Sequence, residues 1–170
     1  MPTHLVWFRA DLRIHDNFAL AAACRAKDAN VLALSIATPE QWRQHDMAPR
    51  QVALLSAYLN DLQHSLAEKG IPLIYKEAHD FAAQRQTVQA ICQQHAVTHL
   101  YYNYQYEFNE QQRDRQLEKT LAGVVCEGFD DSVMLAPGSV MTGNHEMYKV
   151  FTPFKNAFIK RLKEGLPECV

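Results

Sequence analysis

The sequence predicts an α/β protein built on a five-stranded, doubly wound parallel sheet with helices on both faces. Two observations carry this prediction: five short apolar runs rich in β-branched and aromatic residues, and four helical patterns that alternate with them. Strands that are buried on both faces read as continuous apolar runs, as these do. Ligands of such sheets bind beyond the carboxyl ends of the strands, where the strand order reverses.

The expected strands are short and are separated by polar segments. They lie at residues 4–9, 31–37, 72–76, 98–103 and 124–129. Because a helical pattern follows each of the first four strands, right-handed crossovers place all five strands in one parallel sheet.

The helical patterns lie at residues 17–26, 49–70, 81–91 and 107–121. The longest begins at Pro49, where proline suits a first helical turn, and Gly70 ends it. It carries apolar residues three or four positions apart, which are Val52, Leu55, Leu59, Leu62 and Leu66. Asp16 and Asp80 are candidate N-caps. We expect a loop around Trp42 and His45.

The pattern changes after Phe129. Residues 130–145 hold Pro137 and two glycines and predict an irregular connection, and residues 147–162 predict a helix interrupted near Pro153. This C-terminal linker segment with a helix carries basic residues among aromatic ones, which are Tyr148, Phe151, Phe154 and Phe158. We expect these rings to need a packing partner, and the segment from Asp131 to be mobile, rearranged or paired with a second copy.

Composition argues for one cytoplasmic globular domain. The chain has 170 residues, of which 48% are hydrophobic and 21% charged, which argues against disorder and coiled coil. Its net charge of −2 gives no support to DNA or an anionic membrane as its direct partner. No apolar run is long enough to cross a bilayer. Four widely spaced cysteines without a C-x-x-C pair predict a reduced protein.

Motifs that signal chemistry are missing. The sequence has no G-x-G-x-x-G, no P-loop, no G-x-S-x-G and no H-E-x-x-H. Cys92 and His95 stand three apart on a helix, but without a second pair they favour packing over metal binding. Asp130 and Asp131 favour turn or capping roles over acid–base chemistry. We therefore expect no catalytic residue and no metal site in this chain.

A charged loop follows the first expected strand. Arg9, Asp11, Arg13 and Asp16 come in close succession between Trp7 and Leu20. Alternating charges of this kind can lock a loop through paired guanidinium and carboxylate groups. We favour such a structural clamp over direct contact with a ligand.

An aromatic and polar segment, residues 101–110, follows the fourth expected strand. Its four tyrosines, with Asn109 and Glu110, suit a planar heterocycle that carries several N–H donors. Glu110 could accept two hydrogen bonds from an amino-pyrimidinone edge. The alternative is helix capping by Glu107 and Asn109 with tyrosines packed on their neighbours, and composition alone favours that alternative.

Four segments carry a resemblance to a known family. They are residues 7–20, 102–107, 126–131 and 141–154, which begin WFRADLR, YNYQYE, CEGFDD and MTGNHEMYKVFTPF. Together they resemble the DNA photolyase/cryptochrome family, and most closely its bacterial cyclobutane pyrimidine dimer photolyases. The likeness covers essentially the whole chain, and the four segments occur in the family's order.

The resemblance implies a division of labour. Members of the family are flavoproteins with an N-terminal α/β domain, a connection, and a C-terminal helical domain that binds FAD and damaged DNA. The resemblance therefore implies an antenna-binding domain at residues 1–130 and the start of the connection at residues 131–170. The helical domain is outside this sequence, so we expect the chain alone to be inactive in dimer repair.

The resemblance also implies an antenna chromophore. In folate-type photolyases, 5,10-methenyltetrahydrofolate is held with help from an Asn-Glu pair, which matches Asn109 and Glu110. His45 matches a further residue near the antenna. Other members use a deazaflavin instead, and we expect the folate to bind this domain weakly.

Two other functions stay open at this point. One is the antenna domain of a cryptochrome photoreceptor, which the same fold and antenna site would serve. The other is a stand-alone α/β module that binds a small ligand. The likeness of residues 141–154 to bacterial repair enzymes favours the repair photolyase. Its expected partners are its own helical domain and, through that domain, damaged DNA. We expect no membrane partner.

Overall fold

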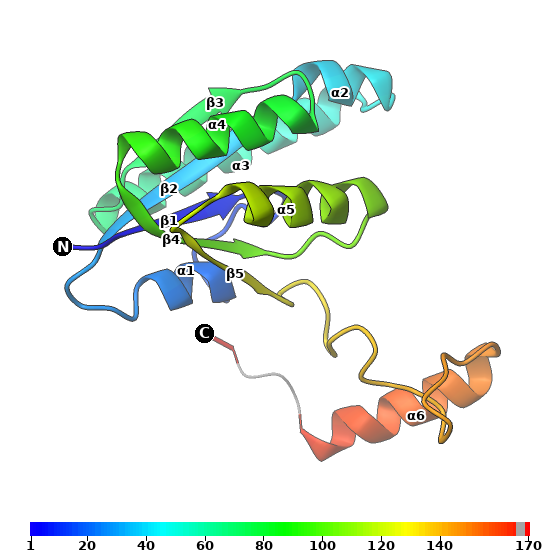
Figure 1. Cartoon of the computed structure of the whole chain (residues 1–170). Coiled ribbons are helices and arrows are strands. Elements are labelled where there is room, and N and C mark those ends of the chain that lie inside the picture. The colour runs from blue at the N-terminus through cyan, green and yellow to red at the C-terminus, as the bar shows by residue number, and fades with distance from the viewer. Residues whose placement is uncertain (166–168) are drawn as a thin grey trace.

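A computed structural model describes residues 1–165 and 169–170 and has a five-stranded, all-parallel sheet at its centre (Figure 1). The strands are β1 (Thr3–Phe8), β2 (Asn30–Ala37), β3 (Leu73–Glu77), β4 (Val97–Asn103) and β5 (Val125–Phe129). Their spatial order is β3-β2-β1-β4-β5. The predicted fold class is confirmed. The strand order reverses between β1 and β4, because β2 and β3 lie on one side of β1 and β4 and β5 lie on the other.

The described residues also form six helices. They are α1 (Phe18–Ala23), α2 (Pro39–Gln44), α3 (Pro49–Glu68), α4 (Phe81–Gln94), α5 (Phe108–Thr120) and α6 (Phe151–Glu164). The expected loop around Trp42 is wrong, because α2 forms there with Pro39 in its first turn. This helix is shorter than two turns and buries no residue, so it leaves no apolar stripe in the sequence.

The two predicted N-caps have different outcomes. Asp80 caps α4, where its carboxylate accepts a hydrogen bond of 2.8 Å from the backbone N–H of Ala83. The prediction for Asp16 is wrong, because Asn17 caps α1 and accepts a 3.0 Å hydrogen bond from the N–H of Leu20. Asp16 lies one residue outside the cap with a φ of 50°. Asp16 and Asn17 both carry the short side-chain oxygen that can accept a capping hydrogen bond.

The core has two parts, one on each face of the sheet. Helices α4 and α5 cover one face, and α1 and α3 cover the other. Alternate residues of β1 serve the two parts, so that Trp7 packs under α4 and α5 whereas Phe8 packs on the other face. Both side chains are buried. The sheet is therefore the middle layer of three.

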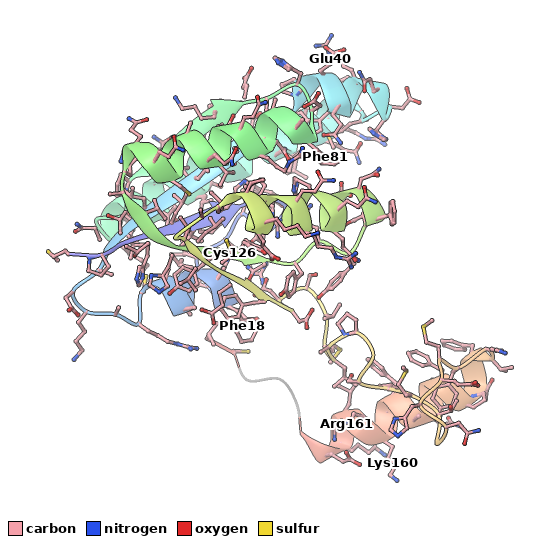
Figure 2. The ribbon with its side chains drawn as sticks, in the orientation of Figure 1. Phe18, Glu40, Phe81, Cys126, Lys160 and Arg161 are labelled. Atoms are coloured by element: carbon pink, nitrogen blue, oxygen red, sulfur yellow. The ribbon has the colours of Figure 1, made fainter. Side chains whose placement is uncertain are left out.

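Beyond β5 the chain leaves the sheet, and α6 stands apart from it (Figure 1). Pro153 lies in the first turn of α6, so the expected interruption of this helix is wrong. The rings of Tyr148 and Phe154 lie 6.1 Å apart and those of Phe154 and Phe158 5.7 Å apart, whereas Phe151 is 71% exposed. Figure 2 shows Lys160 and Arg161 on α6, away from the sheet. The expected mobility and self-association stay predictions.

Three further observations concern the described residues. No helix among them is long and apolar enough to cross a membrane. Three or more metal-binding side chains do not gather at any point within residues 1–165 and 169–170. All four cysteines are free thiols, and burial raises the pKa of Cys92 to about 12 and that of Cys126 to about 11.

Replacement of Leu66 by alanine should lower the free energy of unfolding by about 2–5 kcal/mol, because this side chain is fully buried beneath the sheet. Leu54→Ala is the matched control on the same helix, since Leu54 is 51% exposed and its loss should change stability by about 0.5 kcal/mol or less. Urea unfolding measures both. Equal effects of the two substitutions would contradict the packing of α3.

Candidate functional site

A cavity of about 650 Å³ opens at the carboxyl ends of β1 and β2. The strands contribute Trp7 and Ile36 to its lining. Around them stand α2, the start of α3 and the first turns of α4 and α5. The cavity thus lies at the edge of the sheet where parallel α/β folds hold their ligands.

The three residues matched to the antenna site all line this cavity. His45 is the C-cap residue of α2, and Asn109 and Glu110 lie in the first turn of α5. Glu107, the N-cap residue of α5, makes no side-chain capping bond and lines the cavity as well. Capping therefore does not account for the carboxylate of Glu107. The cavity brings Glu107, Asn109 and Glu110 together with His45.

The cavity wall is also aromatic. The chain has two tryptophans, and both Trp7 and Trp42 line the cavity, together with Phe81 from the start of α4. Aromatic side chains supply flat apolar surface to which a planar ring can pack. The intrinsic fluorescence of this protein therefore comes from the wall of its own candidate site.

Beneath the cavity lies a buried cluster of charged groups. The carboxylate of Asp114 pairs with Nη1 of Arg9 at 2.7 Å and with Nη2 of Arg113 at 2.8 Å. All three side chains are 6% exposed or less. Two guanidinium groups thus share one carboxylate, which leaves one net positive charge below the cavity.

The two arginines also hold the tryptophan of β1. The guanidinium carbons of Arg113 and Arg9 lie 4.6 and 5.1 Å from the ring centre of Trp7. Burial lowers the pKa of Arg113, and the charge of Asp114 opposes that shift. Among the described residues, Nε of Arg9 is the one buried side-chain nitrogen or oxygen without a hydrogen-bond partner. The cluster therefore packs both guanidinium groups against Trp7 and keeps one net positive charge.

The charged loop after β1 is fixed by partners from other parts of the chain. Arg9 pairs with Asp114, and Arg13 pairs with Asp131 at 2.6 Å. Asp11 accepts from the backbone N–H of Arg9 at 2.9 Å, and the backbone carbonyl of Asp16 accepts from Arg13. Ion pairs among the four expected clamp residues are not what holds this loop. Of the four, only Arg9 lines the cavity.

Asn103, at the end of β4, is a buried residue that sequence reasoning missed. Its Nδ2 donates to Asp11 at 2.7 Å and to Oδ1 of Asn17 at 3.0 Å, and its Oδ1 accepts from the N–H of Ala19 at 3.1 Å. These bonds tie the ends of β1 and β4 to the start of α1. An asparagine at the end of an apolar strand is the signal that could have indicated this role.

The tyrosines of residues 101–110 do not line this cavity. Tyr102 is buried and donates to Glu118, and burial raises its pKa. Tyr106 donates to Asp130 at 2.8 Å, and burial together with this bond raises its pKa to about 12. The tyrosines pack on neighbours, as the alternative interpretation of this segment held.

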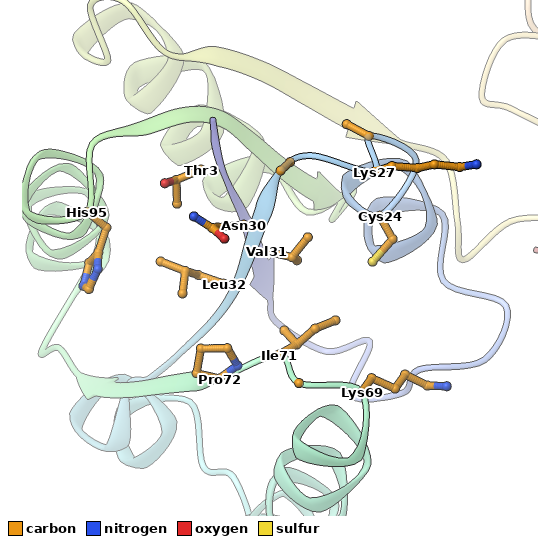
Figure 3. A pocket seen from close by; sticks show the side chains of 13 residues that line it. Thr3, Cys24, Lys27, Asn30, Val31, Leu32, Lys69, Ile71, Pro72 and His95 are labelled. Atoms are coloured by element: carbon orange, nitrogen blue, oxygen red, sulfur yellow. The ribbon is translucent and has the colours of Figure 1, made fainter. Parts of the chain in front are cut away.

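A second cavity, of about 560 Å³, lies at the opposite edge of the sheet (Figure 3). Lys69, Lys27 and His95 line it, next to the ends of helices or in the turns that follow them. Positive side chains near helix C-termini stabilise the helix dipole, which accounts for their presence there. None of the residues matched to the antenna site lies at this edge.

The model of the DNA photolyase family matches residues 4–170. The chain belongs to the DNA photolyase family. Over its full length it is 71% identical to a deoxyribodipyrimidine photo-lyase of Salmonella typhimurium and 66% identical to one of Escherichia coli. It spans 36% of the length of each of these relatives.

Solved structures agree on the fold. A Synechocystis cryptochrome is similar over the whole chain, with a TM-score of 0.85, 25% identity and 35% of its own chain covered. An archaeal photolyase from Sulfolobus tokodaii, solved with two FAD molecules, is similar over 98% of the chain and 36% of its own, with a TM-score of 0.73 and 22% identity. This photolyase-family domain thus shares its architecture with both classes of protein.

Asp114→Asn in this photolyase-family domain should lower the free energy of unfolding by about 3–5 kcal/mol, because it leaves two buried guanidinium groups without a carboxylate. Glu40→Gln breaks the exposed pair with Arg43 and should cost about 0–1 kcal/mol. Thermal and urea unfolding compare the two. An Asp114→Asn protein as stable as Glu40→Gln would show that the buried cluster does not hold the fold.

Proposed function

We propose that this chain is the N-terminal antenna-binding domain of a light-dependent DNA repair photolyase, and that its cavity holds the antenna chromophore. One observation carries the proposal: His45 and the adjacent pair Asn109 and Glu110, which stand far apart in the sequence, line a single cavity at the ligand-binding edge of the sheet. Membership in the photolyase family, which implies a flavin and a second chromophore, supports it.

The chemistry of the cavity fits 5,10-methenyltetrahydrofolate. The pterin ring of a folate is planar and carries an amino-pyrimidinone edge. The carboxylate of Glu110 can accept from the two adjacent N–H donors of that edge, and Asn109 offers one further donor and acceptor. Trp42 and Phe81 offer apolar walls. A volume of about 650 Å³ is that of a small-molecule site.

The domain's own contribution is binding and orientation. When bound, the folate supplies light absorption and transfer of excitation energy to FAD. Glu110 and Asn109 fix the edge of its ring, and the aromatic walls keep water from its face. Reduced FAD, the splitting of the pyrimidine dimer and damaged DNA belong to the helical domain of a full-length photolyase. None of the residues in this chain is proposed to be catalytic.

The division at residue 130 also belongs to this proposal. The last strand of the sheet ends at Phe129, and the following segment departs from the sheet toward α6. Residues 131–170 would then be the start of the connection to the helical domain. The exposed Phe151 and Met147 fit a segment that packs on another part of the full-length protein.

Sequence identity to the curated relatives favours repair over signalling. The chain is 66–71% identical to proteins named deoxyribodipyrimidine photo-lyase, but 25% identical to the Synechocystis cryptochrome. These values support a repair photolyase over a photoreceptor. They also support a part of a larger flavoprotein over a stand-alone module.

Glu110→Ala should weaken binding of 5,10-methenyltetrahydrofolate at least about tenfold, because the two N–H donors of the pterin edge lose their charged acceptor. Titration of the chain, followed by folate absorption and by the fluorescence of Trp7 and Trp42, measures this. Glu40→Ala is the control, since that carboxylate is on α2 but does not line the cavity. Unchanged affinity of the Glu110→Ala protein would contradict the assignment of Glu110.

A hybrid protein tests the antenna role itself. This chain would replace the matching 170 residues of the Escherichia coli relative, with which it is 66% identical. With Glu110→Ala, repair of pyrimidine dimers should slow under limiting light and keep its rate under saturating light, because the flavin itself also absorbs. Equal repair by both hybrids under limiting light would contradict the antenna role.

A further inference from the structure

Arg113 fixes the orientation of two glutamine side chains that line the cavity. Its Nη1 donates to Oε1 of Gln84 at 3.2 Å, and its Nη2 donates to Oε1 of Gln105 at 3.0 Å. A guanidinium group has donors and no acceptor, so each amide must turn its oxygen toward Arg113. The NH₂ group of each glutamine then points away from Arg113.

The arrangement is held rigidly from below. Arg113 is 3% exposed, its Nε donates to Oδ1 of Asp114 at 2.9 Å, and its Nη2 lies 2.8 Å from the same oxygen. Its guanidinium also lies over the rings of Trp7 and Phe81. Because the ion pair with Asp114 and the two flanking rings hold the planar guanidinium, the directions of its remaining N–H bonds are held as well. The two amides therefore have one orientation.

The NH₂ groups of Gln84 and Gln105 make no hydrogen bond to any described residue. Both glutamines line the cavity. The one buried side-chain nitrogen without a partner in the described chain is Nε of Arg9, so Nε2 of Gln84 must reach accessible space although its residue is only 5% exposed. The space it lines is the cavity, so the two amides present donors there.

Acceptors stand beside these donors. Glu110 lies three residues before Arg113 on α5, which places the two side chains on the same face of that helix. Burial lowers the pKa of Arg113, and the charge of Glu110 opposes that shift, which agrees with the proximity of the two side chains. The cavity therefore offers a charged acceptor next to a pair of fixed donors. A ligand that satisfies both must carry N–H donors beside a carbonyl oxygen.

We propose that Gln84 and Gln105, oriented by Arg113, determine ligand specificity by donating to the ring carbonyl that lies next to the N–H groups bound by Glu110. This inference rests on the proposed function and names the part of the pterin that the cavity distinguishes. A 4-oxo ring presents an acceptor to the two amides. A 4-amino ring presents N–H against N–H, which leaves donors unpaired on both sides.

Folic acid and aminopterin test this, because the 4-oxo group and the adjacent N3–H of folic acid are replaced in aminopterin by a 4-amino group and an unprotonated N3. Glu110 also loses one donor in aminopterin, so the response of the preference to substitution of Gln105 separates the amides from Glu110. The chain should bind folic acid at least about tenfold more tightly than aminopterin, since unpaired donors in a partly buried site are costly. Quenching of the fluorescence of Trp7 and Trp42 measures both affinities.

Gln105→Glu should reverse this preference toward aminopterin. The glutamate keeps an acceptor for Arg113 and offers its second oxygen to the 4-amino group. Gln86→Glu is the matched control on α4, because Gln86 is exposed and does not line the cavity. It should leave the preference for folic acid unchanged, and a purely structural role of Gln105 would not reverse a preference.

Three outcomes would overturn the inference. Equal affinity of the unaltered chain for the two pterins would do so while leaving folate binding in place. A folded Gln105→Glu protein that still prefers folic acid would do so too. No saturable binding of either pterin up to millimolar concentration would overturn the folate proposal and this inference together. Equal affinity of the unaltered chain for the two ligands overturns the inference even where Gln105→Glu does not fold.

Discussion

The buried carboxylate of Asp114 is the group on which the candidate site depends. It joins Arg9, at the end of β1, to Arg113, on α5, and so links the central strand to the helix that carries Asn109 and Glu110. Taking two guanidinium groups out of water for one carboxylate is costly. The carboxylates of Glu107 and Glu110 at the cavity offset part of the excess positive charge. On the proposed function, Asp114 therefore couples the stability of the fold to the binding of the ligand.

A second network of hydrogen bonds links strands to a helix on the other face of the sheet. Asn103 connects Asp11, Asn17 and the start of α1, and Asp131 accepts from both Arg13 and the N–H of Phe18. These hydrogen bonds link the loop after β1, the end of β4 and the start of α1. The cavity of the candidate site lies on the side of α4 and α5, at the ends of β1 and β2. Buried polar groups that are fully paired fix such an arrangement.

The sequence carried enough information for the sheet and for three cavity residues, but not for their support. Continuous apolar runs predict the strands, and the family's Asn-Glu pair locates Asn109 and Glu110. The partner of Arg9 lies 105 residues away, so no local pattern could identify it. The tyrosines pack away from the cavity, because alternation along β4 sends Tyr101 and Tyr102 into the two halves of the core. A residue type alone does not reveal which layer it enters.

A crystal structure of the chain soaked with 5,10-methenyltetrahydrofolate tests the central claim most directly. The account predicts electron density for the pterin between α5 and the turn that joins α2 to α3, with its amino-pyrimidinone edge on Glu110. Density for the folate at the opposite edge of the sheet, beside Lys69 and His95, would contradict it. So would a pterin at the predicted edge that makes no contact with Asn109 or Glu110.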